Sequence, residues 1–225
     1  YNDMGNAIGK SMDYSSAKFD EQLMGIVNRL EEDFDVKEII TFNGSKGNFR
    51  KKINPKYKAN RKNQELPPLL HKMHQYVKDN YNSVYGYGLE TDDLVARYWT
   101  VLSHEIGRDN VMIVSIDKDY KQFPALIYNY HYKHKCIYDI SKEGALYNFY
   151  EQMIMGDTSD NVNYFFGKGR AFAKNYYKGC KTKYQYTRKL FELFKKEYKS
   201  KAREKYIECY NLLKLRTQWI QDKHQ

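Results

Sequence analysis

Residues Val111 to Ile116 form the apolar run that most constrains the fold of this 225-residue chain. The run reads Val-Met-Ile-Val-Ser-Ile and is rich in β-branched residues. This pattern is typical of a strand buried on both faces of a parallel sheet, because strands with one solvated face usually alternate apolar and polar residues. It predicts an α/β protein in which helices flank a mostly parallel central sheet.

Other helix and strand patterns alternate along the first part of the chain. An apolar face predicts a first helix, which Ser15 and Ser16 can cap. Hydrophobic residues with turn signals at their ends predict short strands elsewhere. The predicted elements are a loop at 1–14, strands at Val36–Phe42, Ser83–Tyr87, Leu126–Tyr130 and Cys136–Asp139, a helix after Pro67 and Pro68, and two basic helices at Lys183–Ser200 and Ala202–Arg216.

The alternation of helices and strands ends near residue 140, and the later sequence has helical patterns. We therefore predict an α/β domain over residues 1–140 and a helical region over residues 141–225. The helical region contains an acidic motif at 156–161 and a glycine-containing turn at 161–173.

Positive charge is concentrated in two segments. Residues 46–62 contain eight Lys or Arg and no acidic residue, and residues 168–216 contain sixteen Lys or Arg against four Glu, a net charge of +12. Because the whole chain has a net charge of +10, the rest of it carries −10. Two basic surfaces beside an acidic centre favour a polyanion held next to a cation-binding site.

Several classes of protein do not fit the sequence. No apolar run approaches the ~18 residues that a membrane-spanning helix needs, so no membrane partner is expected. No signal peptide is recognisable. The three cysteines, Cys136, Cys180 and Cys209, are far apart and lack CxxC spacing. They fit a reduced protein better than a disulfide framework or a zinc site.

Three groups of carboxylates follow predicted strands or lie in a turn. Since the carboxyl ends of parallel strands meet at one sheet edge, we expect the three groups to converge there. Their repulsion would favour Mg²⁺ or Mn²⁺, and two such ions can hydrolyse a phosphodiester. An acidic helix N-terminus is the alternative explanation for the first group taken alone. The groups are Glu90, Asp92 and Asp93; Asp117 and Asp119; and Asp157 and Asp160.

Four stretches of the chain carry a resemblance to a known family. They are Phe49-Arg50 with Tyr57 to Arg61, Glu90 to Asp93, Ser115 to Asp119, and Gly156 to Asn161. In this order they resemble the phage and bacterial 5′-3′ exonucleases and flap endonucleases, a family that includes the 5′ nuclease domain of bacterial DNA polymerase I. The resemblance extends from about Thr41 to Ala173.

The resemblance implies roles for individual residues. It implies that the seven carboxylates hold two divalent metal ions. It also implies that Lys58 and Arg61, on a helical arch at 46–62, contact the scissile phosphate and the 5′ strand. Arg50 and Tyr57 are further candidates for this DNA-binding surface, Tyr57 by stacking on a base.

The family has a glycine-rich, helix-hairpin-helix-like turn after its last acidic motif. The residues Gly167-Lys168-Gly169-Arg170 match the core of that turn and open a basic helix. The resemblance implies that their backbone amides bind duplex phosphates, with K⁺ near Gly167 and Gly169. An ordinary helix-entry turn is the alternative. Tyr164 and Phe172 replace smaller residues of the family, which weakens the expectation of a K⁺ site.

The sequence also departs from the family at two metal positions. The family begins with an apolar strand that ends in a metal-binding Asp, whereas Asp3 and Asp13 lie in polar, unpatterned sequence. We therefore expect that strand and its Asp to lie upstream of Tyr1; the alternative is that the strand is absent. Asn43 stands where the family has an Asp, and an amide is a weaker, uncharged ligand.

We predict a metal-dependent, structure-specific 5′ nuclease that cleaves DNA with free 5′ ends, flaps or junctions. From the resemblance, a monomer acting in replication is expected, in the host cytoplasm if a phage encodes it. Two alternatives stay open. One is a non-catalytic DNA-junction-binding protein of the same fold, and the other is an RNase H-like activity on RNA–DNA hybrids.

Overall fold

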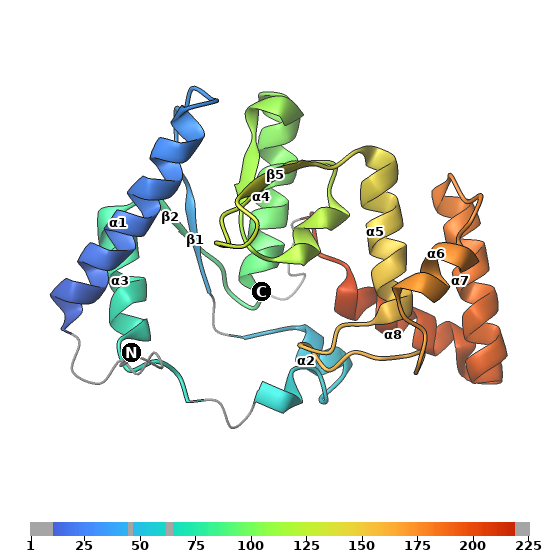
Figure 1. Ribbon diagram of the computed structural model, residues 1–225. Helices are drawn as coiled ribbons and strands as arrows, with labels where there is room; N and C mark the ends of the chain where they lie inside the picture. Colours follow the sequence, from blue (N-terminus) through green and yellow to red (C-terminus); the bar gives the residue numbers. More distant parts are fainter. Residues whose placement is uncertain (1–10, 45–46, 62–64, 219–225) are drawn as a thin grey trace.

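Helices dominate the computed structural model, which describes residues 11–44, 47–61 and 65–218 (Figure 1). The elements in the first 85 residues are α1 (Met12–Glu31), β1 (Thr41–Asn43), α2 (Arg50–Ile53), η1 (Ala59–Arg61), α3 (Leu70–Asn80) and β2 (Ser83–Tyr85). The elements after them are α4 (Thr91–Glu105), η2 (Arg108–Asn110), β3 (Met112–Val114), η3 (Lys118–Gln122), β4 (Leu126–Asn129), β5 (Cys136–Asp139), α5 (Lys142–Met155), α6 (Arg170–Tyr176), α7 (Lys183–Tyr198), η4 (Lys199–Lys201) and α8 (Ala202–Leu213).

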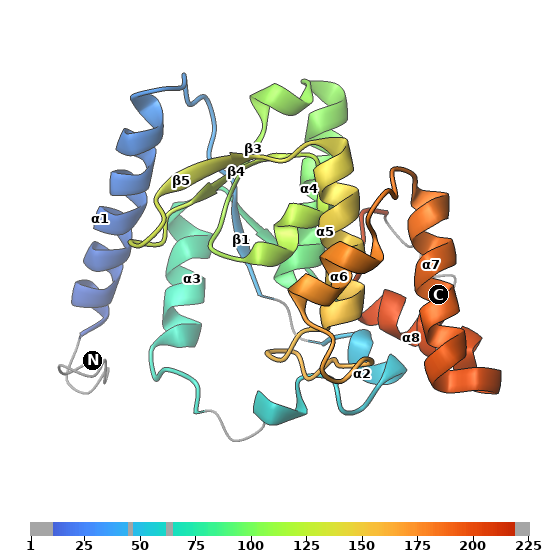
Figure 2. The ribbon, with the colours of Figure 1, turned by 45° about the vertical axis from the view of Figure 1, so that its right-hand side comes forward.

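The strands form two small sheets in the described part of the chain. Strands β1 and β2 pair in parallel, with Phe42 opposite Val84. Strand β3 pairs in parallel with β4, and β4 pairs antiparallel with β5. Two of the three pairings are thus parallel, and helices flank both sheets (Figure 2). This arrangement confirms the predicted α/β class.

The strand at 111–116 differs from its prediction in burial. Strand β3 covers only Met112–Val114, and Ile113 packs in a core with Ala96 and Trp99 of α4. Val114 is 41% exposed, and Ile116, beyond the strand, is 52% exposed. The expectation of burial on both faces is therefore wrong. Neighbouring side chains of a strand point to opposite faces, and only the face that carries Ile113 packs against α4.

Other element boundaries follow local chemistry. The first helix begins earlier than predicted, because the side chain of Ser11, not of Ser15 or Ser16, accepts the capping hydrogen bond from the Tyr14 N–H at 3.2 Å. Strand β1 is shorter than the predicted Val36–Phe42. The predicted loop at 1–14 lies largely outside the described residues. Strands β4 and β5 match their predictions to within one residue.

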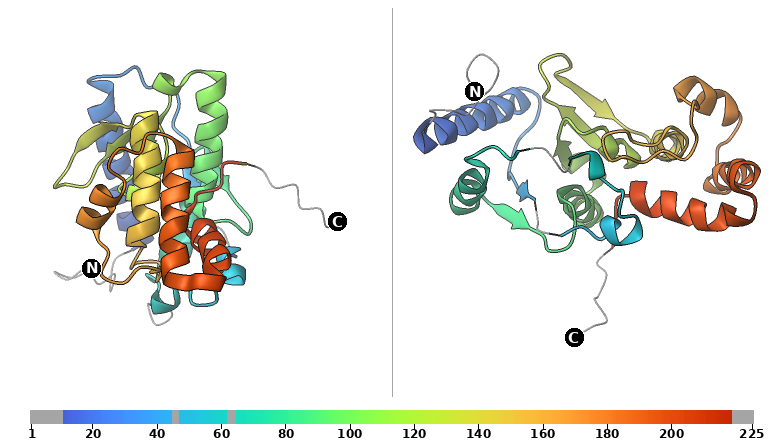
Figure 3. Two further views of the ribbon diagram at one scale, coloured as in Figure 1. Left: turned by 90° about the vertical axis from the view of Figure 1, so that its right-hand side faces the viewer. Right: turned by 90° about the horizontal axis from the view of Figure 1, so that it is seen from below.

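Two hydrophobic cores support the fold. One lies between α4 and the β3–β5 sheet, and the other between α5, α6, α7 and α8. Residues before and after position 140 contribute to both cores. Leu215, near the C-terminus, packs in the core beside the sheet, and Tyr57, from the first part of the chain, packs in the core between the helices. Helix α5 lies between the sheet and the last helices in the views of Figures 2 and 3. The division at residue 140 stays a prediction.

Within residues 11–44, 47–61 and 65–218, no helix combines the length and the apolar character that crossing a membrane demands.

Candidate active site

Arg50 is the centre of a buried ion-pair network. Its guanidinium donates to both carboxylate oxygens of Asp93, at 2.6 and 2.9 Å, and to Glu90 at 3.0 Å. Both oxygens of Asp93 thus accept hydrogen bonds from Arg50, and one also accepts from the backbone N–H of Arg216. The side chains of Arg50 and Asp93 are 1% and 0% exposed. Arg50 is therefore buried against Asp93, its contact with DNA stays a prediction, and Asp93 is not available as a metal ligand in this conformation.

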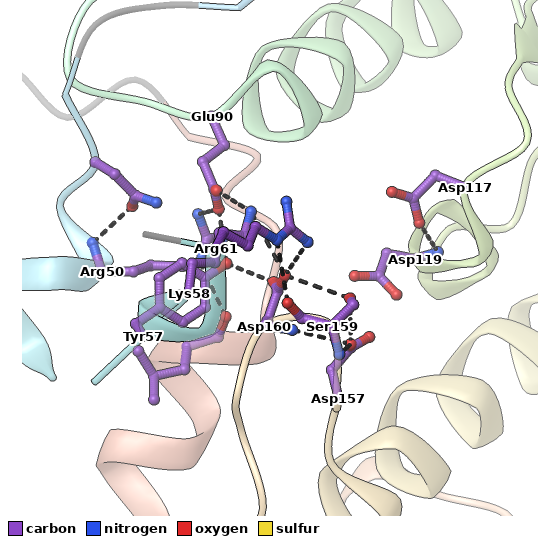
Figure 4. A network of polar contacts seen from close by, with 12 residues as sticks. Arg50, Tyr57, Lys58, Arg61, Glu90, Asp117, Asp119, Asp157, Ser159 and Asp160 are labelled. Carbon is purple, nitrogen blue, oxygen red and sulfur yellow. Dashed lines mark hydrogen bonds and ion pairs between the residues drawn. The ribbon is translucent and has the colours of Figure 1, made fainter. Parts of the chain in front are cut away.

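Glu90 and Asp160 lie on either side of Tyr57. The tyrosine hydroxyl is 2.8 Å from Glu90 and 2.6 Å from Asp160, so the two carboxylates share its single proton. The ammonium of Lys58 donates to Glu90 and lies 3.6 Å from Asp160, and Arg61 pairs with Asp160 at 2.9 Å. Tyr57 is only 2% exposed, so its ring is not open to a base in this conformation, and the stacking stays a prediction. Lys58 and Arg61 lie beside acidic residues, as Figure 4 shows.

Asp92, Asp117 and Asp119 form a second group of carboxylates. Burial, followed by the charge of Asp117, raises the pKa of Asp92 to about 6, although Tyr120 donates a hydrogen bond to it at 3.0 Å. Burial and the charges of Asp117 and Asp157 raise the pKa of Asp119 to about 7. Gln152 holds Asp119 in place by donating to it at 2.8 Å. These carboxylates are close enough to repel one another.

Asp157 joins this group from the turn after α5. Its Oδ1 accepts from the backbone N–H of Ser159 at 2.8 Å and from the Ser159 hydroxyl at 2.5 Å. Lys118 pairs with its Oδ2 at 2.9 Å. Burial alone raises the pKa of Asp157, but the hydrogen bonds from Ser159 and Lys118 outweigh burial and hold the pKa below its usual value. Asp157 is therefore an ionised carboxylate fixed in orientation.

Gly156 sets the turn that presents Asp157. It has φ 72° and ψ −166°, a conformation essentially restricted to glycine. A Cβ at this position would lie 2.2 Å from the carbonyl oxygen of Val162, which accepts a hydrogen bond from the Asp157 N–H.

We expect Gly156→Ala to destabilise the protein by at least about 1–3 kcal/mol, the typical cost of such backbone strain. Chemical unfolding in EDTA measures this loss. Gly25→Ala is the matched control, because nothing lies within 4 Å of its added Cβ and Gly25 is inside α1, where Ala is favoured. Equal stability of the two variants would contradict the role of Gly156.

Six of the seven predicted carboxylates face a shared region, and Asp93 is the exception. Asp117, Asp119 and Asp157 lie on one side, and Glu90 and Asp160 lie on the other (Figure 4). Asp92 joins the first side through the charge of Asp117. Over the part of the chain that the structure describes, no three His, Cys, Asp or Glu side chains are placed closely enough to form a finished metal site. Lys58 and Lys118 currently neutralise part of this charge.

The group of Asp92, Asp117, Asp119 and Asp157 has the ligand atoms that a hard divalent cation prefers. It consists of carboxylate oxygens, and the raised pKa values of Asp92 and Asp119 report uncompensated negative charge there. Asn43 does not extend this set, because its amide donates to the Ser83 hydroxyl at 2.7 Å and its side chain is buried.

The glycine-containing turn leads into α6. Gly167 has φ 74°, which suits glycine, and Gly169 precedes the first residue of α6. Lys168 lies 3.8 Å from Glu197, and Arg170 lies 3.4 Å from Glu151 with 74% of its side chain exposed. The turn thus presents positive charge to solvent on its Arg170 side.

Sequence reasoning missed three residues that organise the site. Tyr120 and Gln152 donate to Asp92 and Asp119, and Lys118 pairs with Asp157. Lys118 had a detectable signal, because it lies between the two aspartates of a predicted metal motif. No sequence signal marked Gln152, which is 33 residues from its partner.

The fold and the site together define an α/β protein in which a group of six carboxylates lies beside basic side chains. This group, the carboxylate rim, consists of Glu90, Asp92, Asp117, Asp119, Asp157 and Asp160. The family model described as the 5′-3′ exonuclease, N-terminal resolvase-like domain matches residues 16–150, which is more than half of the chain. The chain belongs to this family of 5′-3′ exonucleases.

Solved structures share the fold at low sequence identity. A bacteriophage T5 protein co-crystallised with metal ions has a TM-score of 0.60 and 18% identity, over 84% of this chain and 80% of that one. The T5 flap endonuclease in a complex with DNA and metal ions has a TM-score of 0.58 and 16% identity, over 84% and 78%. The T5 5′-exonuclease with bound zinc has a TM-score of 0.56 and 16% identity, over 87% and 92%. No curated protein matches the sequence.

Proposed function

We propose that this chain is a divalent-metal-dependent 5′ nuclease that hydrolyses phosphodiester bonds of DNA, as a 5′-3′ exonuclease, a flap endonuclease or both. The observation that carries the proposal is the group formed by Asp92, Asp117, Asp119 and Asp157. Burial, followed by the charges of neighbouring aspartates, raises the pKa values of Asp92 and Asp119, and a bound divalent cation would favour the ionised form of both.

The proposed metal ligands are six carboxylates rather than the seven expected. Asp92, Asp117, Asp119 and Asp157 are the first candidates for Mg²⁺ or Mn²⁺. Glu90 and Asp160 are the candidates for a second ion. Two bound ions would supply an activated water and stabilise the leaving oxygen of a phosphodiester. Asp93 is left out of the proposed ligand set, because Arg50 occupies both of its oxygens.

The basic residues of the site are proposed to bind the substrate phosphate. Lys58 and Arg61 extend toward Glu90 and Asp160, so a phosphate that approaches the carboxylate rim meets their positive charges first. Arg61 is 44% exposed at its side chain, whereas Lys58 is 18% exposed. We therefore assign Arg61 to the entering 5′ strand and Lys58 to the scissile phosphate.

Duplex DNA is proposed to lie along the C-terminal helices. Support comes from the net charge of +12 over residues 168–216 and from the exposed Arg170 at the start of α6. Backbone amides near Gly167 and Gly169 are the proposed contacts to duplex phosphates, together with Lys168 and Arg170. A K⁺ ion near the two glycines stays part of this proposal.

Lys58→Ala is expected to lower cleavage of a 5′-flap DNA by about 100-fold or more, because a charge that stabilises the phosphoryl group is lost. Thermal stability should fall little by comparison. Cleavage rates under single-turnover conditions and melting temperatures measure the two effects. Lys37→Ala is the matched control, since Lys37 pairs with Asp35 at a surface where both side chains are more than 70% exposed. Equal losses of rate and stability would make Lys58 a structural residue.

One assay separates the proposal from its two rivals. Purified protein is incubated with a labelled 5′-flap DNA or an RNA–DNA hybrid, in Mg²⁺, Mn²⁺ or EDTA. The proposal expects cleavage of the flap DNA that EDTA abolishes. Binding without cleavage in any metal would favour the non-catalytic junction-binding protein, a candidate because Lys58 and Lys118 already pair with proposed ligands. Preferred cleavage of the hybrid would favour the RNase H-like activity.

A further inference from the structure

A lysine-lined cavity lies away from the carboxylate rim, between α5, α7 and α8. Its volume is about 220 Å³. Three ammonium groups and three aromatic rings line it, and no Asp or Glu does so in the described part of the chain. These residues are Lys142, Lys183, Lys214, Phe149, Tyr150 and Tyr210.

The cavity is separate from the proposed metal site. It lies beside α5 from Lys142 to Tyr150, whereas Asp157 follows the C-terminal end of the same helix. The five residues after Tyr150, up to Met155, correspond to about 7.5 Å of helix, which separates the nearest part of the cavity from the turn that carries Asp157.

Lys214 is held rigidly at the edge of this cavity. Its backbone N–H donates to the Tyr210 carbonyl at 2.8 Å, and its carbonyl accepts from Arg50 at 3.1 Å. The neighbouring Leu213 and Leu215 are 3% and 4% exposed. Gln122 fixes both of these neighbours, because it donates to the Leu213 carbonyl and accepts from the Leu215 N–H. The position of the lysine is therefore set by the fold before any ligand arrives.

The ammonium of Lys214 has aromatic neighbours instead of a counter-ion. It lies 4.7 Å from the ring centre of Phe149 and 5.4 Å from that of Phe123. No ion pair joins it to a carboxylate among the described residues. Burial, followed by the charge of Lys183, lowers the pKa of Lys214 to about 8. A partly buried cation that faces another cation is unfavourable unless an anion compensates it.

The two other lysines add to the positive potential. Lys142 and Lys183 are the first residues of α5 and α7, where the helix macrodipole already places partial positive charge. A lysine at this end of a helix is electrostatically unfavourable. These two contributions meet the charge of Lys214 in one cavity, and a single anion would interact favourably with all three lysines.

We propose that this cavity binds a small phosphate-type anion, either inorganic phosphate or the phosphate group of a mononucleotide. Phosphate accepts hydrogen bonds from several ammonium groups at once, which suits three lysines converging from separate helices. The volume accommodates a phosphate group with part of a nucleoside and excludes a duplex. The site is independent of metal binding at the carboxylate rim.

Calorimetric titration and thermal shift in EDTA test the proposal with inorganic phosphate and with dAMP as probes, against NaCl at matched ionic strength. Wild-type protein should bind at least one probe and melt at a higher temperature with it than in NaCl. Lys214→Met should weaken binding at least tenfold, yet melt above wild type without an anion, because a buried charge is removed. Tighter binding of dAMP identifies a mononucleotide, and equal binding identifies phosphate itself.

Lys195→Met is the matched control, since Lys195 also lies over an aromatic ring, Phe191 at 5.1 Å, but outside the cavity. It should bind both probes as wild type does. The proposal is overturned if wild-type protein responds to the probes no more than to NaCl, or if Lys214→Met binds them unchanged. It is also overturned if neither probe binds and Lys214→Met weakens only duplex DNA binding, since the lysine would then belong to the DNA surface.

Discussion

Asp119→Asn should reduce metal-dependent cleavage of 5′-flap DNA by more than about a thousandfold, the scale on which losing a principal electrostatic contribution to catalysis is felt. Asp119 lies beside Asp117 and Asp157, and the amide that replaces it has no charge to offer a divalent ion. The substitution preserves shape, and the hydrogen bond from Gln152 has an oxygen to accept it. Binding of flap DNA in EDTA should therefore be retained, or improved by the loss of one negative charge.

The same variant should also melt at a higher temperature than wild type in EDTA, because one of several mutually repelling carboxylates is gone. Asp109→Asn is the matched control: the side chain of Asp109 is 81% exposed and pairs with the neighbouring Arg108 at 3.0 Å. This control should cleave like wild type. Cleavage by Asp119→Asn within tenfold of wild type would contradict the metal assignment. Loss of cleavage together with a lower melting temperature would indicate a folding defect instead.

Local patterns predicted the secondary structure well where local chemistry decides it. Strands β4 and β5 ended within a residue of their predicted bounds, because turn residues flank each of them. Burial was harder to predict, as Val114 shows. Its apolar neighbours suggested two buried faces, yet exposure depends on which helices and strands cover the sheet. That depends on contacts between residues far apart in the sequence, which periodicity does not contain.

The candidate site, too, could be predicted from the sequence only in part. The three acidic motifs could be found from sequence, because strand ends share a sheet edge and two Asp at i, i+2 are a local signal. The crowding of Glu90 and Asp93 on one helix face was also foreseeable. The pairing of these carboxylates with Arg50 was not foreseeable, because Arg50 lies 43 residues before Asp93 in the sequence. An ion pair between residues far apart in the sequence produces no local sequence pattern. Arg50 was therefore indistinguishable from the other seven basic residues of its segment.

Arg50→Met should destabilise the protein by about 3–5 kcal/mol, the usual cost of removing one partner from a buried ion pair. The substitution leaves Asp93 fully buried without its cation, and it removes the hydrogen bonds from Arg50 to the carbonyls of Leu212 and Lys214. These bonds join α2 and α4 to the end of α8, so the loss should loosen the C-terminal helices from the sheet. Urea unfolding followed by circular dichroism measures the change.

Two further variants decide why stability is lost. Arg29→Met removes an arginine from pairs with Glu32 and Asp33 on the exposed surface of α1, and it should leave the unfolding midpoint nearly unchanged. The double variant Arg50→Met with Asp93→Leu should recover a large part of the loss, because no unpaired charge then remains buried near α4. A double variant as unstable as Arg50→Met alone would assign the loss to the carbonyl contacts and not to Asp93. In that case Asp93 would regain its place as a candidate ligand, since its pairing with Arg50 would be energetically weak enough for a metal ion to replace.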